Sequence, residues 1–363
     1  MVEAGGNKLL IVAKKDLSRK EERKLGRIVN RLARRRFEVD VKRTPSVEAA
    51  QEAIKDSIGN VHGLGIFGGD GALRTAVEAL VDNPTPSDQL PLLFAVRGAG
   101  SIKLFQKATG NYLSERGVAR TLEEGKSYEM DIIRARIDGG TANGGRDLYF
   151  LSNASLGKLI GGLFNQKDRT KSKRGGFWGY LPLVPKVVND AKEFTAEVTT
   201  NENQTKKTFK TPEIFVLNGG KGGFIAFDPD QAYDGKELLS IVFNDVPVLK
   251  SKFTIAASVL SGLIFDATHP GKQSEFEQRF RAEKIRIDLP EGDPIYLQLD
   301  GDGVGVVNSS IEFSIAEKPI RVMLRDQSRP GIRRRLQEIF HLQGRPFRQE
   351  GEKVVWTSSK RSN

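Results

Sequence analysis

Four consecutive residues, Gly68-Gly69-Asp70-Gly71, have the types and spacing that phosphate chemistry requires. They follow an apolar run that ends at Phe67 and precede Leu73 and Val77, which recur at helical spacing. Glycines let the backbone approach an anion, and the first N–H groups and the dipole of the following helix point toward it. Asp70 could hold a phosphate-bound Mg²⁺ or could only cap the helix. The pattern predicts a phosphate site, with a tight turn that binds no ligand as the alternative.

A second acidic motif, Asp300-Gly301-Asp302, follows an alternating stretch over residues 295–299. Phosphoryl transfer to an alcohol needs a cradle for the polyphosphate, a cation and a carboxylate that takes the hydroxyl proton. In an extended segment, residues two apart point to the same side, so both carboxylates could face one cleft. The alternative is a polar Asp-Gly turn between strands, which the nearby Gly303 favours.

These motifs need elements that position them, and in the first part of the chain strands alternate with helices. A Ser18-capped helix and a helix over 47–58 separate the first strands. Strands are predicted over residues 8–13, 37–41, 64–67 and 92–96. This order indicates a parallel, doubly wound sheet. Its ligands belong beyond the carboxyl ends of the strands, where Thr44, the Gly68 turn and Gly98-Ala99-Gly100 fall.

From about Met130 the pattern changes to short alternating strands with turn residues between them, which predicts a mostly antiparallel β-sandwich. Helices are expected around 178–191 and 248–265. The predicted strands cover 130–137, 147–153, 194–200, 213–217, 238–243, 284–289, 295–299 and 311–315. The predicted domains are 8–127, completed by 317–340; 128–316; and a basic polar tail over 341–363.

Composition excludes several classes of chemistry. The 363 residues contain no Cys and three His, so thiolate catalysis is excluded and a His-based zinc site is disfavoured. No apolar run reaches the roughly 20 residues of a membrane span, and we expect a cytoplasmic chain. The net charge of +11 implies an anionic partner: nucleotide phosphate, nucleic acid or an acidic membrane.

The order of the motifs resembles that of the bacterial soluble diacylglycerol kinase family, which shares its catalytic domain with sphingosine and ceramide kinases. The likeness covers roughly residues 8–325. Besides the Gly68 and Gly98 loops, it includes a predicted strand and Gly turn at Asp147–Asn153 followed by Ala154-Ser155-Leu156-Gly157. It also includes the 228–235 segment and Asp300-Gly301-Asp302. NAD kinases and phosphofructokinases share the first loop, but the last two motifs argue against both.

The resemblance implies ATP- and Mg²⁺-dependent phosphorylation of a lipid hydroxyl, most simply that of diacylglycerol, in a cleft between the two domains. Asp302 stands where the family has its proton-accepting Glu, and Asp300 would position it or bind metal. Asp234 resembles the side-chain ligand of a structural Mg²⁺ site. The nucleotide would contact the two glycine loops, Thr44 and Lys15, with Lys14 as an alternative to Lys15.

Several positions depart from the family pattern. Ala72 replaces Thr after the first loop, and Arg74 replaces a small polar residue. Ser101-Ile102-Lys103 replaces Asn-Asp-Phe and removes a carboxylate. These departures support a second hypothesis, a degenerate protein that binds lipid or nucleotide without turnover.

Two basic stretches suggest peripheral contact with an anionic membrane. Cations over 167–174 precede Phe177, Trp178 and Tyr180, which suit a membrane interface, although a solvated loop is the alternative. Residues 325–363 carry ten Lys or Arg against four Asp or Glu, including Arg333, Arg334 and Arg335. Nucleic acid is the weakest candidate partner because no recognised binding motif is present. A second copy of the chain is a further candidate partner.

Overall fold

The computed structural model describes residues 7–97, 115–124, 126–138, 146–160, 184–190, 192–200, 205–218, 221–222, 225–226, 236–243, 277–290, 294–324, 347–350 and 353–356. The chain divides into two compact units. The first comprises residues 1–132 and 316–329, and the second comprises residues 133–315 and 330–363.

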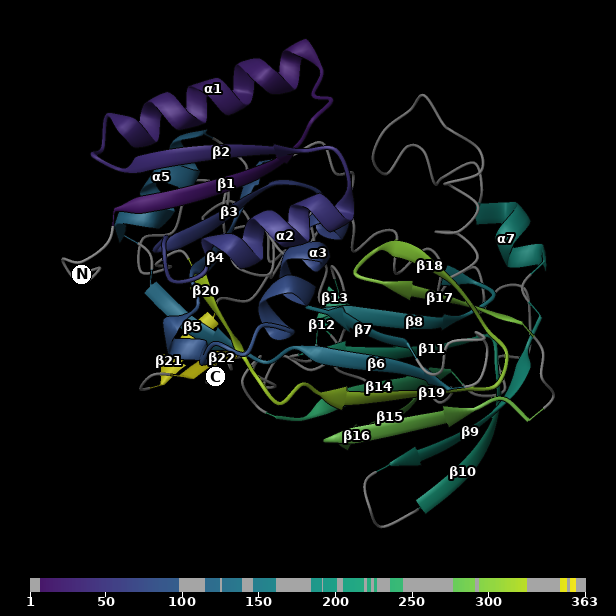
Figure 1. Cartoon of the computed structure of the whole chain (residues 1–363). Coiled ribbons are helices and arrows are strands. Elements are labelled where there is room, and N and C mark those ends of the chain that lie inside the picture. The colour runs from purple at the N-terminus through teal and green to yellow at the C-terminus, as the bar shows by residue number, and fades with distance from the viewer. Residues whose placement is uncertain are drawn as a thin grey trace, which may run out of the picture. The chain divides into compact units, whose positions relative to one another are not determined.

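The first unit is built on a six-stranded sheet with the strand order β2-β1-β3-β4-β20-β5 (Figure 1). Neighbouring strands are parallel except β5, which runs antiparallel to β20 at one edge. A short 3₁₀ turn covers Ser87–Gln89. The other elements are β1 (Lys8–Lys14), α1 (Arg19–Ala33), β2 (Glu38–Thr44), α2 (Val47–Ser57), β3 (Gly63–Gly68), α3 (Asp70–Val81), β4 (Leu92–Arg97), α5 (Glu115–Glu124), β5 (Lys126–Met130) and β20 (Ile320–Leu324).

The helices of this unit pack as two pairs, because successive side chains of a strand point to opposite faces. On one face, Leu25 and Ile28 of α1 and Leu122 of α5 pack in a cluster with Leu9 and Ile11 of β1. The pair α2 and α3 contacts β1, β2 and β3, and Leu10 and Val12 of β1 alternate with the residues of the α1 cluster. The doubly wound arrangement predicted from the sequence is confirmed.

Strand β20 joins the first sheet from late in the sequence and lies between β4 and β5. The strand predicted over 130–137 is confirmed from residue 133 onward, but its predicted start at Met130 is wrong. The chain instead forms β5 in the first sheet and β6 (Ile133–Asp138) in another, because Asp131 and Ile132 interrupt the strand. Apolar residues alternate on both sides of the break, but the phase of the alternation changes between Ile132 and Ile133, which are adjacent and both buried.

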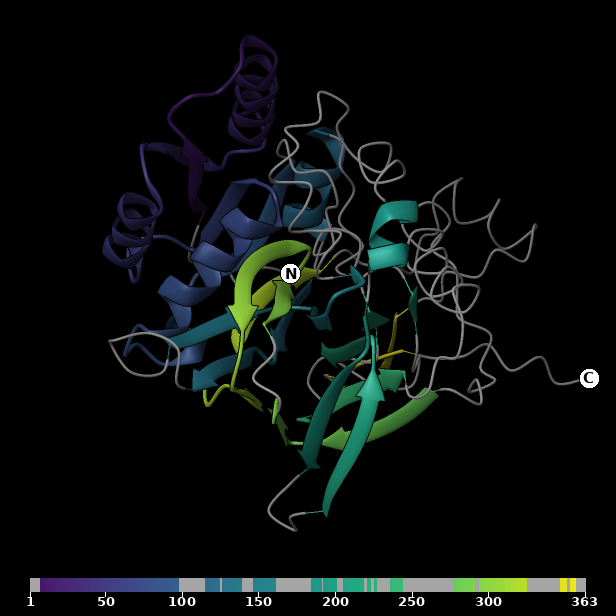
Figure 2. The ribbon, with the colours of Figure 1, turned by 90° about the vertical axis from the view of Figure 1, so that its right-hand side faces the viewer.

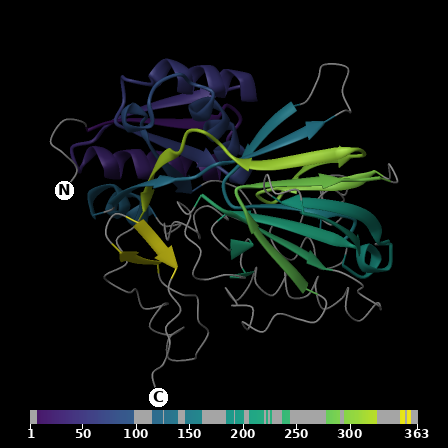
Figure 3. The same cartoon turned by 90° about the horizontal axis from the view of Figure 1, so that it is seen from below.

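The second unit contains two six-stranded sheets, with strand orders β10-β9-β16-β19-β6-β7 and β15-β14-β11-β8-β17-β18 (Figures 1 and 3). All pairs in both sheets are antiparallel. The strands are β6, β7 (Arg146–Phe150), β8 (Asn153–Gly157), β9 (Phe194–Thr200), β10 (Thr205–Thr211), β11 (Glu213–Asn218), β14 (Leu238–Phe243), β15 (Glu277–Ala282), β16 (Lys284–Asp288), β17 (Ile295–Leu299), β18 (Asp302–Val307) and β19 (Ser310–Ile315). Strands β9 and β10 pair along their whole length at one edge of the first of these sheets (Figure 2).

Four smaller strands and one helix complete the described elements of this unit. A two-stranded sheet pairs β12 (Lys221–Gly222) with β13 (Ile225–Ala226). Another pairs β21 (Phe347–Glu350) with β22 (Lys353–Trp356), within the stretch expected to be a polar tail. Helix α7 covers Val184–Asp190. The predicted helix over 248–265 lies outside the described residues.

One apolar core joins the two large sheets of the second unit. Phe150 and Phe313 of the first sheet meet edge to face, with ring centroids 6.1 Å apart. They belong to one buried cluster with Leu156 and Leu297 of the second sheet. The predicted antiparallel sandwich is confirmed, but the Gly turn expected at 154–157 is wrong. Those residues lie in β8, a fully buried strand between β11 and β17.

No helix among the described residues is long and apolar enough to cross a membrane.

Candidate functional site

The carboxyl ends of β1, β2 and β3 bring several predicted site residues to one edge of the first sheet. Lys14, the last residue of β1, pairs with Thr44, the last residue of β2. The Lys15 N–H donates to the Thr44 carbonyl over 2.8 Å, and the Thr44 hydroxyl donates to the Ala13 carbonyl over 3.3 Å. Strand β3 ends beside them at Gly68. Ligands of parallel sheets bind beyond this edge.

Helices α1, α2 and α3 begin with different residues, and the difference singles out α3. Ser18 caps α1 in a capping box with Glu21, and the Ser46 hydroxyl accepts a hydrogen bond from the Ala49 N–H in α2. The residue before α3 is Gly69, which has no side-chain acceptor. The start of α3 therefore lacks the hydroxyl cap that the other two helices have, as suits a helix that receives an external anion.

Close packing explains why the first residue of this loop is a glycine. A Cβ added at Gly68 would lie 2.4 Å from the Cβ of Ala72, far inside van der Waals contact. Any side chain at position 68 would therefore push the loop away from the first turn of α3. Ala72, which replaces the Thr of the family pattern, therefore still packs against the loop through its Cβ.

One departure of α3 from the family pattern is Arg74, whose partner Glu78 also contacts α2. The Arg74 guanidinium lies 3.7 Å from the Glu78 carboxylate one turn later. Glu78 also accepts a hydrogen bond from the Gln51 amide of α2 over 3.1 Å. Arg74 Nη1 is buried and has no hydrogen-bond partner among the residues that the structure describes. Asp70 at the start of α3 is buried, with 8% of its surface exposed.

The second acidic motif is a two-residue hairpin turn. Leu299 of β17 pairs with Asp302 of β18, and the two residues between them, Asp300 and Gly301, have φ angles of 49° and 89°. Positive φ at both central residues is the geometry of the tight hairpin turn that Asp-Gly favours. The expectation that 300 and 302 share one side of an extended strand is therefore wrong. Asp302 is half-buried, as the first residue of β18.

Asp300 instead binds the chain at the corner between β7 and β8. Its carboxylate accepts hydrogen bonds from the N–H groups of Leu151, Ser152 and Asn153 at 2.7, 2.8 and 3.1 Å. The side chain is 3% exposed. Charge-assisted bonds to backbone donors are strong in such a buried setting. The contacts show how Asp300 holds the hairpin that presents Asp302.

A second buried carboxylate, which sequence reasoning missed, holds the other end of β8. Glu213 is fully buried and accepts hydrogen bonds from the Leu159 and Ile160 N–H groups at 3.0 and 2.9 Å. A Cβ added at Gly157 would lie 2.1 Å from the Glu213 carboxylate, so only glycine fits there. The one available signal was a charged residue at the start of an otherwise apolar run.

Other predicted positions lie outside the described residues: Gly98, Ala99, Ser101, Ile102, Asp234, the 167–174 cluster with its aromatic residues, and Arg333 to Arg335. Among the residues that the structure describes, no group of three or more His, Cys, Asp or Glu side chains is placed to hold a metal ion.

Sequence comparison relates the chain to a kinase family and to a probable lipid kinase. Residues 8–135 match the diacylglycerol kinase catalytic domain family. The chain is also 26% identical over 276 residues to a probable lipid kinase YegS-like protein of Shewanella frigidimarina, covering 75% of this chain and 79% of that protein.

Solved structures agree on the fold. A putative diacylglycerol kinase from Bacillus anthracis superposes with a TM-score of 0.63 at 19% identity, covering 88% of this chain and 97% of that one. A yeast NADH kinase complexed with NADH superposes with a TM-score of 0.52 at 11% identity, covering 95% and 90%. At these identities the likeness establishes a shared fold.

Proposed function

Because this chain belongs to the family of lipid kinases with a diacylglycerol kinase catalytic domain, we propose that it transfers the γ-phosphoryl group of ATP to a lipid hydroxyl. Diacylglycerol is the proposed acceptor and phosphatidic acid the product. The observation that carries the proposal is the edge of the first sheet, where Lys15, Thr44 and the Gly68 loop meet at a helix start without a hydroxyl cap.

The residues at this edge fit a magnesium nucleotide. Backbone N–H groups at the start of α3 and the Lys15 ammonium would contact phosphate oxygens. Mg²⁺ in kinases is held by one or two carboxylates together with the substrate phosphates, so a three-carboxylate cluster is not required. Asp70, next to the loop, is the carboxylate that would hold it. The bound ion would neutralise charge that develops on the phosphoryl group.

Asp302 is the proposed proton acceptor. A general base must be deprotonated in order to accept the proton of the lipid hydroxyl, and an ionised carboxylate meets this requirement. Asp300 acts as a positioning residue, because its hydrogen bonds to residues 151–153 hold the turn from which Asp302 follows. Asp234 is proposed as the ligand of a separate structural Mg²⁺.

The test is transfer of labelled phosphate from ATP to a panel of lipids, resolved by thin-layer chromatography. We expect diacylglycerol to be labelled and Asp302→Asn to lower the rate by about 10²–10⁴-fold, with nucleotide affinity changed only a few-fold. Asp288→Asn, on another strand of the same unit, is the matched control and should retain the rate. Full activity of Asp302→Asn would remove its assignment as base.

The second candidate is a protein of this fold that binds lipid or nucleotide without turnover. The contact that favours it is the Arg74–Glu78 pair on α3, where the family has a small polar residue. Calorimetry with ATP and Mg²⁺ separates the two hypotheses. Nucleotide binding with no labelled product from any lipid would favour the second, and transfer to any lipid would exclude it.

A further inference from the structure

The positive charge of the chain is concentrated near one helix. Residues 14–43 contain thirteen Lys or Arg against five Asp or Glu, a net charge of +8 out of +11 for the whole chain. This segment includes α1, the helix that covers one face of the first sheet (Figure 1). It is more strongly charged than the C-terminal stretch 325–363, whose net charge is +6.

Most cations of α1 lie on the side opposite its apolar residues. Leu25, Ile28 and Leu32 are buried against the sheet and α5. At 100° per residue, the opposite arc contains five exposed cations and no acidic residue. We call these five residues the α1 basic stripe: Arg19, Lys20, Arg23 and Arg27 of the helix, and Arg34 at its C-cap. It extends over about 22 Å of helix.

The two acidic residues of α1 have other partners and lie off this arc. Glu21 completes the capping box with Ser18, accepting hydrogen bonds from its N–H and hydroxyl at 2.8 and 2.7 Å. Glu22 forms a two-pronged ion pair with Arg43 of β2, including a 2.8 Å contact between Nη2 and Oε2. Both acids therefore serve the fold and lie away from the α1 basic stripe.

Folding does not account for such a stripe. Like charges four residues apart, such as Arg19 with Arg23, destabilise a helix. Cations in the first turn also oppose the helix dipole, which favours negative charge there. Residues that work against their own helix point to a function outside the fold.

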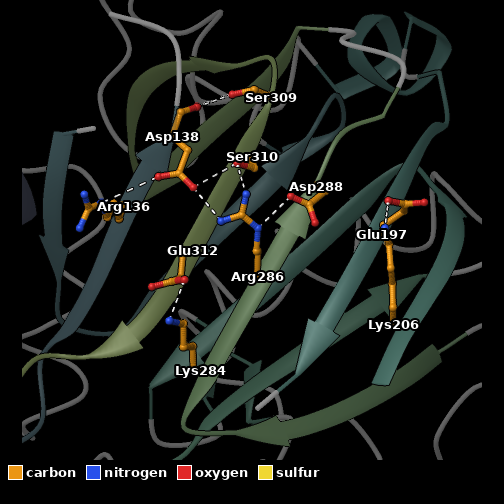
Figure 4. Close-up of polar contacts among 10 residues, drawn as sticks. All are labelled: Arg136, Asp138, Glu197, Lys206, Lys284, Arg286, Asp288, Ser309, Ser310 and Glu312. Atoms are coloured by element: carbon orange, nitrogen blue, oxygen red, sulfur yellow. Dashed lines mark hydrogen bonds and ion pairs between the residues drawn. The ribbon is translucent and has the colours of Figure 1, made fainter. Parts of the chain in front are cut away.

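On the outer face of the first sandwich sheet, cations and acidic residues are interspersed, and the four cations drawn in Figure 4 each have an acidic neighbour. Arg286 contacts Asp138 at 2.7 Å and Asp288 at 2.9 Å. Lys284 contacts Glu312 at 2.9 Å, and Lys206 contacts Glu197 at 2.6 Å. The residues of these ion pairs combine both signs of charge, whereas the α1 basic stripe contains cations alone.

We propose that the α1 basic stripe docks the protein on an anionic lipid surface. A straight row of cations matches a plane of phosphate groups. Residues 19–34 contain no aromatic side chain on which a nucleic-acid base could stack. The large exposed apolar residues among those described are Val47 and Val306, neither on α1, so the contact is electrostatic. This inference rests on the proposed function, which places the substrate in a bilayer.

The test is co-sedimentation of the full chain with vesicles of phosphatidylglycerol and phosphatidylcholine. The variant Arg19→Gln/Lys20→Gln/Arg23→Gln removes three charges from the stripe. Each cation near an anionic surface contributes roughly fivefold to binding, so we expect about 100-fold weaker partitioning. Binding of the unmodified chain should fall with added salt and be absent with pure phosphatidylcholine.

The matched control is Arg136→Gln/Lys206→Gln/Lys284→Gln, with the same charge change at positions that are 51%, 54% and 53% exposed. It should bind within a few-fold of the unmodified chain. Equal loss in both triple variants would overturn the proposal, because net charge alone would then account for binding. So would loss confined to Arg333→Gln/Arg334→Gln/Arg335→Gln, or tight RNA binding with no vesicle binding. Circular dichroism checks that all variants are folded.

Phosphate transfer to a short-chain lipid dispersed in detergent separates this inference from the proposed function. The α1 triple variant should keep its rate there and lose it on vesicles. If no variant transfers phosphate but vesicle binding depends on the stripe, the proposed function fails and docking stands. A rate on vesicles that is unchanged by the α1 triple variant overturns docking alone.

Discussion

The start of α3 and the two ends of β8 differ in the side chains that accept hydrogen bonds from backbone N–H groups. The residue before α3 is Gly69, which has no side-chain acceptor. The preceding Gly68 has no room for a side chain, because a Cβ there would clash with Ala72. At β8 two buried carboxylates, Asp300 and Glu213, accept hydrogen bonds from the N–H groups that flank each end of the strand. A buried carboxylate beside a glycine thus serves the fold where it accepts these backbone hydrogen bonds itself, whereas a helix that begins at a glycine without a side-chain cap suits an external anion.

Asp300→Ala should produce the largest loss of stability. It leaves three buried N–H groups without acceptors, at about 1–3 kcal/mol each, so the free energy of unfolding should fall by at least about 3 kcal/mol. Urea denaturation followed by circular dichroism measures the change. The control Asp302→Ala should cost less than about 1 kcal/mol. Equal losses would break the distinction between the structural and the proposed catalytic residue of the hairpin.

Gly157→Ala should produce the next largest effect, at the other end of β8. The added Cβ would displace the Glu213 carboxylate from Leu159 and Ile160, an overpacking that costs about 2 kcal/mol. Gly26→Ala is the control, because a Cβ there meets no atom within 4 Å and lies in a helix. Alanine should stabilise that helix by roughly 0.5–1 kcal/mol. A neutral Gly157→Ala would show that Glu213 has room to move.

Asp70→Asn tests the other half of the comparison, the start of α3. If this carboxylate serves a bound magnesium nucleotide, the variant should weaken ATP binding in the presence of Mg²⁺ by more than tenfold, about 1.4 kcal/mol, as measured by calorimetry. Asp56→Asn, on the exposed side of α2, makes the same charge change and should leave affinity unaltered. Strong unfolding by Asp70→Asn, comparable to that of Asp300→Ala, would instead place it with the structural carboxylates.

The smallest effect concerns pH and His62, which immediately precedes β3. Burial, together with the charge of Arg321, lowers the pKa of His62 below its ordinary value of 6.5. The folded state therefore favours the neutral ring, and its contribution to stability is present above pH 6.5 and lost as pH falls through the lowered pKa. Between pH 7 and 5.5, the thermal midpoint of His62→Gln should fall less than that of the unmodified chain. Parallel curves would contradict the assignment.

Local patterns in the sequence predicted much of the first unit correctly. The predicted cap of α1 by Ser18 is confirmed, and it needs no distant partner because its hydroxyl accepts a hydrogen bond from Glu21, three residues later. The glycines before α3 follow from the tight turn between a buried strand and a helix. In the sandwich, the apolar pattern predicted β9, β11, β14, β16 and β17, all of which contribute residues to a common core.

Long-range contacts decided the rest. The hydrogen bond from Leu151 to Asp300 spans 149 positions, so no local pattern distinguishes a positioning carboxylate from a catalytic one. Local preference favours a turn at Gly157, although its lack of a side chain makes room for Glu213 of a neighbouring strand. The sequence by itself determined which residues turn, cap and alternate, because those preferences act over a few residues. Only the tertiary structure decided which carboxylates hold backbone donors, because their partners meet only when distant strands pair.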